Sequence, residues 1–598
     1  MKNNKKVRIG CASAFWGDTS TAAKQLVEKG DLDYLVFDFL AEMTMSILAR
    51  AKLKDSDRGF AGDFLTQIEP LLPLIKQKGI KILTNAGGIN PISCRAMLER
   101  TTKKEGLDLK IAIVTGDDLF PELPSIEELG ITELDTGNPF PESCLSINAY
   151  LGAPGLVAAL EKNADIIITG RCVDSALVLA PLMHEFNWNQ SDYDLLASGS
   201  LAGHIIECGA QCTGGNFTDW KDIDGFDDMG FPIVEVESNG DFIVSKPRGT
   251  GGMVTFGTVA EQFLYEIGNP AEYILPDVVC DFTGVTINDF GKDLVHVSGA
   301  SGSPPTNQYK VSATFRDGYR VNGTLVIGGR DSGLKGEIIA NAIIKKVNNI
   351  LKEKGLDPLN ETSYDLIGTD SIYGKNHSKR ESREIVLRLA SKHPQKEALI
   401  ILSQELAQAV TGMPAGVINY LGGRPPVSPS IELFSFLYAK DQVKVEIDIN
   451  GQTSPVKIDS AGRYNLKMNN LRLEEKSQNK SQNLSKVPLF KLAFARSGDK
   501  GNHANIGVIA RKPEYFAYIN NELTCKAIEN YFPHVLKGKV LSWCVPGING
   551  INFLLKDSLG GGGMASMNID PQGKSYAQQL LEYEIPVDDE LFSSLNKT

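Results

Sequence analysis

The sequence has no run of about 20 consecutive apolar residues, the length that a membrane-spanning helix needs. We therefore expect no membrane partner. The opening residues, MKNNKKVRIGCASAFW, carry positive charge but lack the apolar segment of a secretory signal. The nine cysteines include no CxxC pair, and their odd number favours a reducing compartment over a disulfide framework. Together these absences predict a cytoplasmic protein.

An excess of positive charge is also missing. Lys and Arg total 61 against 73 Asp and Glu, which gives a formal net charge of -12. Nucleic-acid affinity comes mainly from Lys and Arg side chains that neutralise phosphates, so this balance predicts no nucleic-acid partner. A small anionic molecule is still an acceptable ligand, because a pocket can be basic on an acidic protein.

Signatures of cofactor binding are absent or weak. The Gly-rich stretches match neither GxxxxGK[ST] nor GxGxxG in a strand-to-helix context, so we predict no nucleotide cofactor. Cys208 and Cys212 have a spacing seen in zinc pairs, but no second pair follows at the spacing of a zinc ribbon. We predict no metal. Magnesium held by carboxylates at strand ends is the alternative, since hard oxygen ligands suit it.

The first third of the chain alternates short apolar runs with helical patterns, which predicts an α/β fold with a mainly parallel sheet. The runs are KVRIGCASA, LDYLVFDFL, GIKILTNAG, LKIAIVTGDD and ADIIITGR. Ligands of such sheets bind beyond the carboxyl ends of the strands, so the polar residues there predict one shared site. Helix capping is the alternative for any one of them. These residues are Trp16, Asp18, Asp38, Glu42, Asn85, Asn90, Thr115, Asp117, Asp118, Arg171, Asp174 and Ser175.

The rest of the chain divides into further segments. The middle, about 201–330, is Gly-rich, and the two-residue period of YKVSATF and YRVNGTLVIGG predicts an antiparallel hairpin. DSGLKGEIIANAIIKKVNNILKEKG predicts a long amphipathic helix, and NLRLEEKSQNKSQNLSKVP predicts a flexible linker. The last segment has the strand and helix order of a small α+β, ferredoxin-like domain. We predict an N-terminal α/β domain with a Gly-rich antiparallel insertion over 6–470, a linker over 471–486 and the small domain over 487–590.

The stretch ARSGDKGNHANIGV holds more donors and acceptors than a turn requires. We predict a concave loop in which backbone N–H groups and the Lys500 ammonium bind a carboxylate, a phosphate or an oxyanion. Asp499 is expected to pair with Arg496 or to orient Asn502. The alternative is a structural loop whose Asx side chains satisfy local backbone groups. We also expect the small domain to close over the large one so that this loop faces the strand ends.

Four carboxylates are candidates for acid or base chemistry, namely Glu207, Asp18, Glu42 and Asp117. A carboxyl group in an apolar site can have its pKa raised into the working range. Cys208 is the alternative nucleophile, although a buried, inert thiol is commoner. We assign catalysis to Lys500, Asp499, Glu207 and Asp18.

Two arginines are candidates for anion binding. Arg171 can hold a carboxylate bidentately, and its neighbours Asp174 and Ser175 are equally suited to be N-cap residues. Arg424 precedes a Pro pair that fixes its position, and anion recognition and a surface salt bridge are equal alternatives for it. We assign substrate binding to Ser497, Asn502, Asn505, Asn85, Arg171, Asp174, Ser175 and Arg424.

Four long motifs occur in one order along the chain: TGRCVDSALVLAPLMHEFNW, GHIIECGAQCTGGNF, GRPPVSPSIELFSF and ARSGDKGNHANIGV. Together they resemble the acyclic terpene utilisation (AtuA-like) family, over about residues 6–587. The resemblance implies a large N-terminal domain joined to a small ferredoxin-fold domain. It also implies a place in the catabolism of acyclic terpenes or similarly branched acyl-CoA compounds, and it supplies no catalytic role for any residue.

These observations lead to two hypotheses of function. The first is an enzyme of lyase or hydratase type that acts on a branched acyl-CoA or acid. The loop around Lys500 and Asn502 would stabilise a thioester enolate or oxyanion, and Glu207 or Asp18 would move protons. The alternative is a non-catalytic partner or scaffold for an acyl-CoA carboxylase or dehydrogenase, which would not need so many polar strand ends. In both cases we expect a small-molecule ligand and a homo-oligomer.

Overall fold

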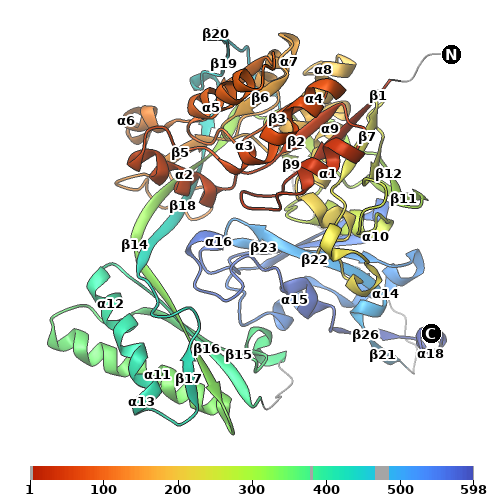
Figure 1. The fold of residues 1–598 in the computed structure, drawn as a ribbon. Coiled ribbons are helices and arrows are strands. Elements are labelled where there is room, and N and C mark those ends of the chain that lie inside the picture. Colours follow the sequence, from red (N-terminus) through yellow and green to blue (C-terminus); the bar gives the residue numbers. More distant parts are fainter. Residues whose placement is uncertain (1–4, 377–381, 465–483, 597–598) are drawn as a thin grey trace.

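The computed structural model describes residues 5–376, 382–464 and 484–596. The chain forms a large N-terminal α/β domain, a lobe that extends from it, and a small C-terminal domain packed beneath it (Figure 1). Most of the predicted linker, 471–486, lies outside the described residues. Its last residues belong to strand β21 (Ser485–Pro488), which pairs with β26 (Glu584–Val587) of the C-terminal domain.

A parallel core lies at the centre of an 11-stranded sheet in the large domain. All four residues of β2 (Tyr34–Phe37) and of β6 (Ile166–Thr169) are buried, as expected for strands that helices cover on both faces. The other parallel strands are β1 (Lys6–Cys11), β3 (Lys81–Thr84) and β4 (Ile111–Thr115). Antiparallel strands extend both edges: β7 (Ile233–Glu237), β8 (Phe242–Ser245), β12 (Leu294–Ser298) and β11 (Thr286–Gly291) beside β1, and β19 (Glu446–Ile449) and β20 (Gln452–Pro455) beside β4.

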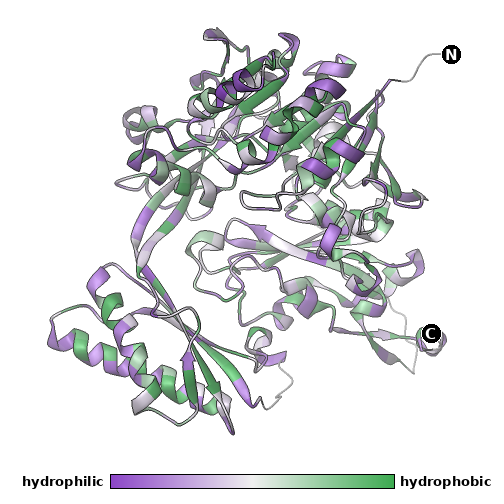
Figure 2. Cartoon of the chain, viewed as in Figure 1, coloured by the Kyte–Doolittle hydropathy of each residue, from purple (hydrophilic) through white to green (hydrophobic). Residues whose placement is uncertain are grey.

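Helices pack on both faces of this sheet and form two separate apolar cores. One core joins alternate strand residues to α1 (Ala22–Lys29), α3 (Asp63–Ile68), α4 (Leu72–Lys78) and α5 (Pro91–Lys104). The other joins the remaining strand residues to α7 (Pro154–Glu161), α8 (Ala176–Phe186) and α9 (Tyr193–Ile206). Each fully buried Leu or Ile contributes about 1.5–3 kcal/mol, so the two cores fix the sheet and its strand ends. In Figure 2 the central strands are apolar and the outer helix faces are polar.

The predicted hairpin of the middle segment is wrong. YKVSATF and YRVNGTLVIGG belong to one continuous strand, β14 (Gln308–Gly328), instead of turning back on each other. Its register against β18 (Ser428–Ala439) shifts between Arg316 and Tyr319, so the intervening Asp317 and Gly318 form a bulge and not a hairpin turn. Gly318 has φ +68°, which a glycine adopts without strain.

Beyond this bulge, β14 and β18 carry the chain into the lobe, whose described residues are 319–376 and 382–428 (Figure 1). Its sheet has the order β15 (Glu361–Ile367), β16 (Glu384–His393), β14 and β17 (Val417–Tyr420). The predicted long amphipathic helix is α11 (Ser332–Glu353). It packs with α12 (Lys396–Glu405) against one face of this sheet and forms a third apolar core.

The C-terminal domain is ferredoxin-like, as predicted. Its antiparallel sheet has the order β22 (Ala493–Lys500), β23 (His503–Ala510), β25 (Gly550–Leu555) and β24 (Val540–Val545). The helices α14 (Phe516–Glu522), α15 (Cys525–Tyr531) and α17 (Tyr576–Leu580) bury one face of the sheet. The other face packs against α10 (Phe256–Leu264) of the large domain.

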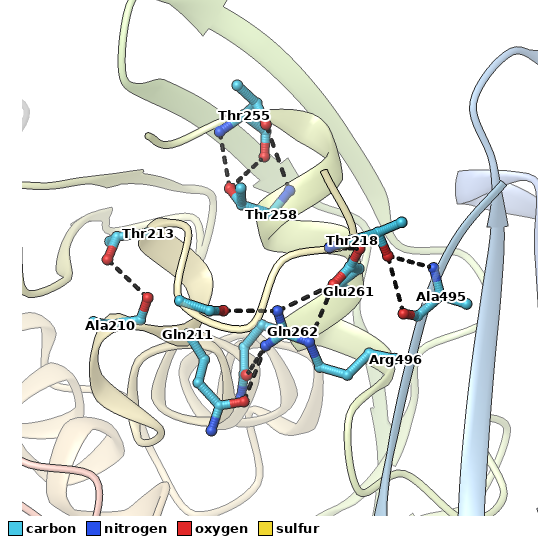
Figure 3. A network of polar contacts seen from close by, with 11 residues as sticks. Ala210, Gln211, Thr213, Thr218, Thr255, Thr258, Glu261, Gln262, Ala495 and Arg496 are labelled. Carbon is cyan, nitrogen blue, oxygen red and sulfur yellow. Dashed lines mark hydrogen bonds and ion pairs between the residues drawn. The ribbon is translucent and has the colours of Figure 1, made fainter. Parts of the chain in front are cut away.

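A buried ion pair fixes this docking (Figure 3). Arg496 of β22 donates from Nε and Nη2 to Glu261 of α10, at 3.2 and 3.1 Å, and Glu261 has no exposed surface. The same guanidinium donates to the side chain of Gln211. The Thr218 hydroxyl also joins the domains, since it bonds both the N–H and the C=O of Ala495 at 3.1 Å. These contacts place the tip of the β22–β23 hairpin beside the strand ends of the large domain.

Among the residues that the structure describes, no helix is both long enough and apolar enough to cross a membrane.

Candidate functional site

Acidic and basic side chains from both domains meet near the carboxyl ends of the parallel strands. Their charges act on one another, as their pKa values show below. We call this group the charged cluster. It comprises Asp38, Glu42, Arg171, Asp174, Glu207, Glu266, Lys310, Asp499, Lys500 and Lys574.

Arg171 lies at the end of β6 and is 5 % exposed. Its Nη1 donates to Asp174 at 2.6 Å, and its guanidinium lies 4.3 Å from the ring centre of Tyr150. Lys310 of β14 lies 5.1 Å from the same ring, and the Tyr150 hydroxyl bonds the Glu42 carboxylate. Two cations therefore flank one tyrosine whose hydroxyl is held by a carboxylate.

Asp117, which follows β4, holds the backbone of Arg171 in place. Its Oδ2 accepts hydrogen bonds from the Arg171 backbone N–H at 2.7 Å and from the Asn148 amide at 3.1 Å. Burial raises the pKa of Asp117 to about 7. Because its carboxyl group is hydrogen-bonded to the backbone of Arg171, Asp117 positions the cluster and is not free to contact a ligand.

Asn85 has a similar supporting role at the end of β3. It is fully buried, its Oδ1 accepts from the Phe39 N–H at 2.8 Å, and its Nδ2 donates to Asp38 Oδ1 at 2.6 Å. The predicted binding residue therefore lies beside the site, but both ends of its amide are used to fix the Asp38 carboxyl group.

Glu207 and His204 form a hydrogen-bonded pair at the end of α9. His204 Nε2 lies 3.1 Å from the Phe263 carbonyl oxygen, and His204 Nδ1 lies 3.0 Å from Glu207 Oε1. A carbonyl oxygen only accepts, so Nε2 carries a proton. Burial lowers the pKa of His204 to about 4, so the ring is neutral near pH 7 and its Nδ1 is an acceptor. The short contact is then a hydrogen bond only if Glu207 carries the proton.

The segment predicted to be a concave loop is instead the tip of a β-hairpin. β22 and β23 pair from Ala493–Ala510 up to Lys500–His503, with Gly501 and Asn502 as the two-residue turn. Gly501 has φ +63°, the sign that the first central residue of a type II′ turn requires. The side chains of a strand alternate between its faces, so only some residues of the segment reach the cluster.

Lys500 projects from this tip toward the large domain, with Nζ 5.0 Å from the ring centre of Tyr273. Gly498 lies on the same face of β22. A Cβ at Gly498 would come within 2.4 Å of the Tyr265 ring and 3.0 Å of Glu266, so only glycine permits this approach. The close contact between the hairpin and the Tyr265–Glu266 segment thus depends on the absence of a Cβ atom at Gly498.

Lys574 closes the group from the loop that precedes α17. Its Nζ lies 3.6 Å from Glu266 Oε1 and 3.9 Å from Asp499 Oδ1, and it bonds the Tyr265 hydroxyl. The prediction that Asp499 pairs with Arg496 or orients Asn502 is wrong. Arg496 pairs with Glu261 of the large domain, and Asp499 lies next to Lys574.

Burial and like charges raise the pKa values of four carboxyl groups of the cluster. Desolvation, followed by repulsion from Asp174, raises the pKa of Asp38 and of Glu207 well above the usual range. Desolvation and repulsion from Asp499 do the same for Glu266, and burial raises the pKa of Asp499 to about 6. These shifts favour the protonated form of each of these four carboxyl groups.

Other groups of the cluster shift in the opposite direction. Burial pushes the pKa of Glu42 upward, but Lys310 and Arg171 outweigh it and bring the value to about 2. Glu42 is thus an anion at neutral pH. The Lys500 side chain is accessible to water, yet desolvation by the surrounding protein, followed by repulsion from Lys310, lowers its pKa. Desolvation also lowers the pKa of Lys574.

Two buried polar atoms of the cluster have no hydrogen-bond partner within the described part of the chain. They are Nε of Arg171 and Oδ1 of Asp499. A buried polar atom left unpaired costs about 1–3 kcal/mol, and such atoms mark positions that a ligand or water satisfies.

Several predicted site residues lie away from the cluster or are used structurally. Asp18 accepts the N–H groups of Ala14 and Thr19 in its own loop. The Ser497 hydroxyl donates to the Gly573 carbonyl and accepts from the Ala577 N–H. Asn502 is used in the turn, where it contacts Asp557 and Gly561.

The remaining three are also outside the cluster. Asn505 is fully buried at the domain contact, where it accepts the Glu266 N–H and donates to the Leu264 carbonyl. Ser175 is the buried N-cap residue of α8, and Arg424 is exposed between β17 and β18 in the lobe. Of the predicted residues, Lys500, Asp499, Glu207, Arg171 and Asp174 belong to the cluster, and Asn85 supports it.

The cysteines are all free thiols. Desolvation, together with Glu266 and Glu207, raises the pKa of Cys208 well above its usual value, which is the opposite of what a nucleophilic thiol needs. No group of three or more His, Cys, Asp or Glu side chains within residues 5–376, 382–464 and 484–596 is arranged to hold a metal ion.

Four residues of the site or its supports are not predicted from the sequence: Lys310, Glu266, Lys574 and His204. His204 stands three residues before Glu207 at the end of α9, a spacing that places the two side chains on one face of the helix. The two lysines lie on a long strand and in a loop, and no local pattern distinguishes them from solvent-exposed lysines. Only the pairing of β14 and the docking of the C-terminal domain bring them to the strand ends.

Two family models match the chain. Residues 7–449 match the acyclic terpene utilisation family protein AtuA, and residues 487–586 match the AtuA ferredoxin-like domain. No curated protein and no solved structure shows a significant match.

Proposed function

The chain belongs to the acyclic terpene utilisation (AtuA) family, which associates it with the catabolism of such compounds. From this premise and the geometry of the charged cluster, we propose that it is an enzyme of lyase or hydratase type. Its substrate is a branched acyl-CoA or the corresponding acid.

One observation carries the proposal: cations and proton-holding carboxyl groups lie together beyond the strand ends. The cluster has four basic side chains, Arg171, Lys310, Lys500 and Lys574, while the raised pKa values of Asp38, Glu207 and Glu266 favour the protonated forms of these three carboxyl groups. Of the other acids, Glu42 remains an anion with a pKa of about 2, and Asp174 is paired with Arg171. The charge of the cluster therefore suits the binding of an anionic carbonyl compound.

The chemistry follows from these charges. Removing a proton beside a thioester, or adding water to a conjugated one, develops negative charge on the carbonyl oxygen. The Lys500 ammonium stabilises this oxygen, and a preorganised donor of this type contributes about 10²–10³ in rate. Glu207 first releases its own proton to solvent, and the resulting carboxylate takes a proton from the adjacent carbon and can return it, while His204 holds the carboxyl group in place. A positioned acid or base of this kind contributes about 10²–10⁴.

Binding calorimetry tests the proposal. The panel is geranyl-, citronellyl-, isovaleryl- and methylcrotonyl-CoA, their free acids, and CoA alone. We expect a branched member to bind the wild-type protein and the affinity to fall at least tenfold in Lys500→Ala. Lys537→Ala, which removes an exposed lysine of the same domain outside the cluster, serves as the matched control.

Two results would argue against this function. If no member of the panel binds, acyl-CoA compounds and their free acids are excluded as substrates. Binding without turnover would favour the alternative, a non-catalytic subunit that presents acyl groups to a carboxylase or dehydrogenase.

A further inference from the structure

A cavity of about 420 Å³ lies between the lobe and the C-terminal domain. The lobe contributes the end of β15 and the short helix that follows it, and the C-terminal domain contributes the residues before α17. The volume falls within the range of about 300–1,000 Å³ typical of small-molecule sites. None of the sequence motifs indicated this cavity.

Apolar side chains from both sides form much of its wall. Ile367 and Ile372 come from the lobe, and Ile569 comes from the C-terminal domain. Ile367 is 38 % exposed, so its side chain is accessible to a molecule in the cavity. The wall thus suits an apolar group.

Lys574 connects this cavity with the charged cluster. It lines the cavity, while its Nζ lies 3.6 Å from Glu266 Oε1 and 3.9 Å from Asp499 Oδ1. A molecule whose anionic end lies beside Lys574 in the cluster would therefore direct its other end into the apolar recess.

The other charged residues of the cavity restrict what that molecule carries. Asp370 and Asp570 also line it. Both oxygens of Asp570 accept hydrogen bonds, from the N–H of Lys574 and from the N–H and hydroxyl of Ser575. These carboxylates disfavour a phosphate-bearing group in the cavity and leave an uncharged chain as the matching occupant.

We propose that this cavity binds the apolar chain of a monocarboxylate or acyl ligand whose head group lies in the charged cluster, so that the lobe sets the chain length accepted. This inference rests on the proposed function for the position of the head group. It adds a second half to the site, built by the lobe, and predicts a selectivity that the cluster alone would not produce.

The test uses straight-chain carboxylates from butanoate to dodecanoate, each below its micelle concentration, with the full-length protein in calorimetry. Burying one methylene is worth about a fourfold gain in affinity, so affinity should rise stepwise with length until the cavity is filled. Ile569→Trp and Ile372→Trp fill the cavity from opposite walls. Each variant should lower the affinity for dodecanoate at least tenfold and the affinity for butanoate less than twofold. Ile418→Trp, at a lobe residue that is 64 % exposed and outside the cavity lining, is the matched control.

The outcomes separate this inference from the proposed function. Affinity that does not depend on chain length, or that neither filling variant changes, overturns the inference while leaving Lys500-dependent binding intact. Affinities that still rise with chain length but are equal in wild type and Lys500→Ala at every length support the cavity and contradict the head-group position in the cluster. No binding by any carboxylate overturns the inference, and the acyl-CoA panel then decides the proposed function separately.

Discussion

The proton on Glu207 is the residue-scale feature on which the chemistry of the site depends. The neighbouring His204 donates through Nε2 to a carbonyl, which leaves its Nδ1 to accept from Glu207 at 3.0 Å. Desolvation raises the pKa of Glu207, which also favours the protonated form. The contact with a neutral His204 and the raised pKa thus both favour the protonated form of this carboxyl group.

This assignment has a consequence for stability as a function of pH. The pKa of Glu207 is raised in the folded protein, so between its unfolded value, about 4.3, and its folded value the folded state binds more protons. The free energy of unfolding that this group contributes therefore falls as pH rises through that window. Glu207→Gln removes the titration, so its melting temperature relative to wild type should increase from pH 4 to pH 8 in calorimetry. Glu514→Gln, at an exposed glutamate, is the control. A difference that stays constant or shrinks with pH would contradict the raised pKa.

The tautomer of His204 is a second residue-scale prediction. Nitrogen NMR of protein labelled at histidine should show a neutral ring protonated at Nε2 from pH 6 to pH 8, with titration near pH 4. The signal is identified by its loss in His204→Gln. A ring that carries protons on both nitrogens at pH 7 would mean that Glu207 is ionised.

At this scale the sequence predicted the residues that a local pattern places. Asp38, Glu42, Arg171 and Asp174 follow parallel strands, whose carboxyl ends meet at one edge, and the structure brings them together. Lys310 and Lys574 escaped prediction because nothing in their neighbouring residues shows which distant surface they approach.

At the scale of elements, the contact between β22 and α10 holds the hairpin tip in place. Arg496 and Glu261 are 5 % and 0 % exposed. Removing one partner of a buried pair leaves an uncompensated charge and costs about 3–5 kcal/mol, whereas replacing both with apolar residues is often close to neutral. Arg496→Met should therefore destabilise the protein by that amount in chemical denaturation, and Arg496→Met with Glu261→Met should recover most of it. Additive losses in the double variant would contradict a direct pair.

The elements also show where sequence patterns succeed and fail. The five parallel strands and α11 were predicted because burial on two faces and a helical period are local signals. The segment around Asp317–Gly318 has the composition of a hairpin turn, yet it forms a bulge in the 21-residue strand β14. Pairing with β18 and β16, which lie more than a hundred and about seventy residues away, decided the outcome.

At the scale of the whole molecule, the site is shared by three parts of the chain. The large domain supplies the strand ends, the C-terminal domain supplies Lys500, Asp499 and Lys574, and the lobe forms one wall of the adjoining cavity. The sequence indicated the first two parts through their motifs. The lobe was not anticipated as a separate body, because its strands are continuations of β14 and β18.

The central claim is that the charged cluster transfers protons to and from an acyl ligand. The most direct measurement is proton NMR of isovaleryl- and citronellyl-CoA incubated with the protein in D₂O, following deuterium entry at the carbon beside the thioester. We predict exchange with the wild type and with Lys537→Ala, and a loss of at least a hundredfold in Glu207→Gln and in Lys500→Ala. Exchange that is equally fast in all four proteins, or absent from the wild type, would contradict the account.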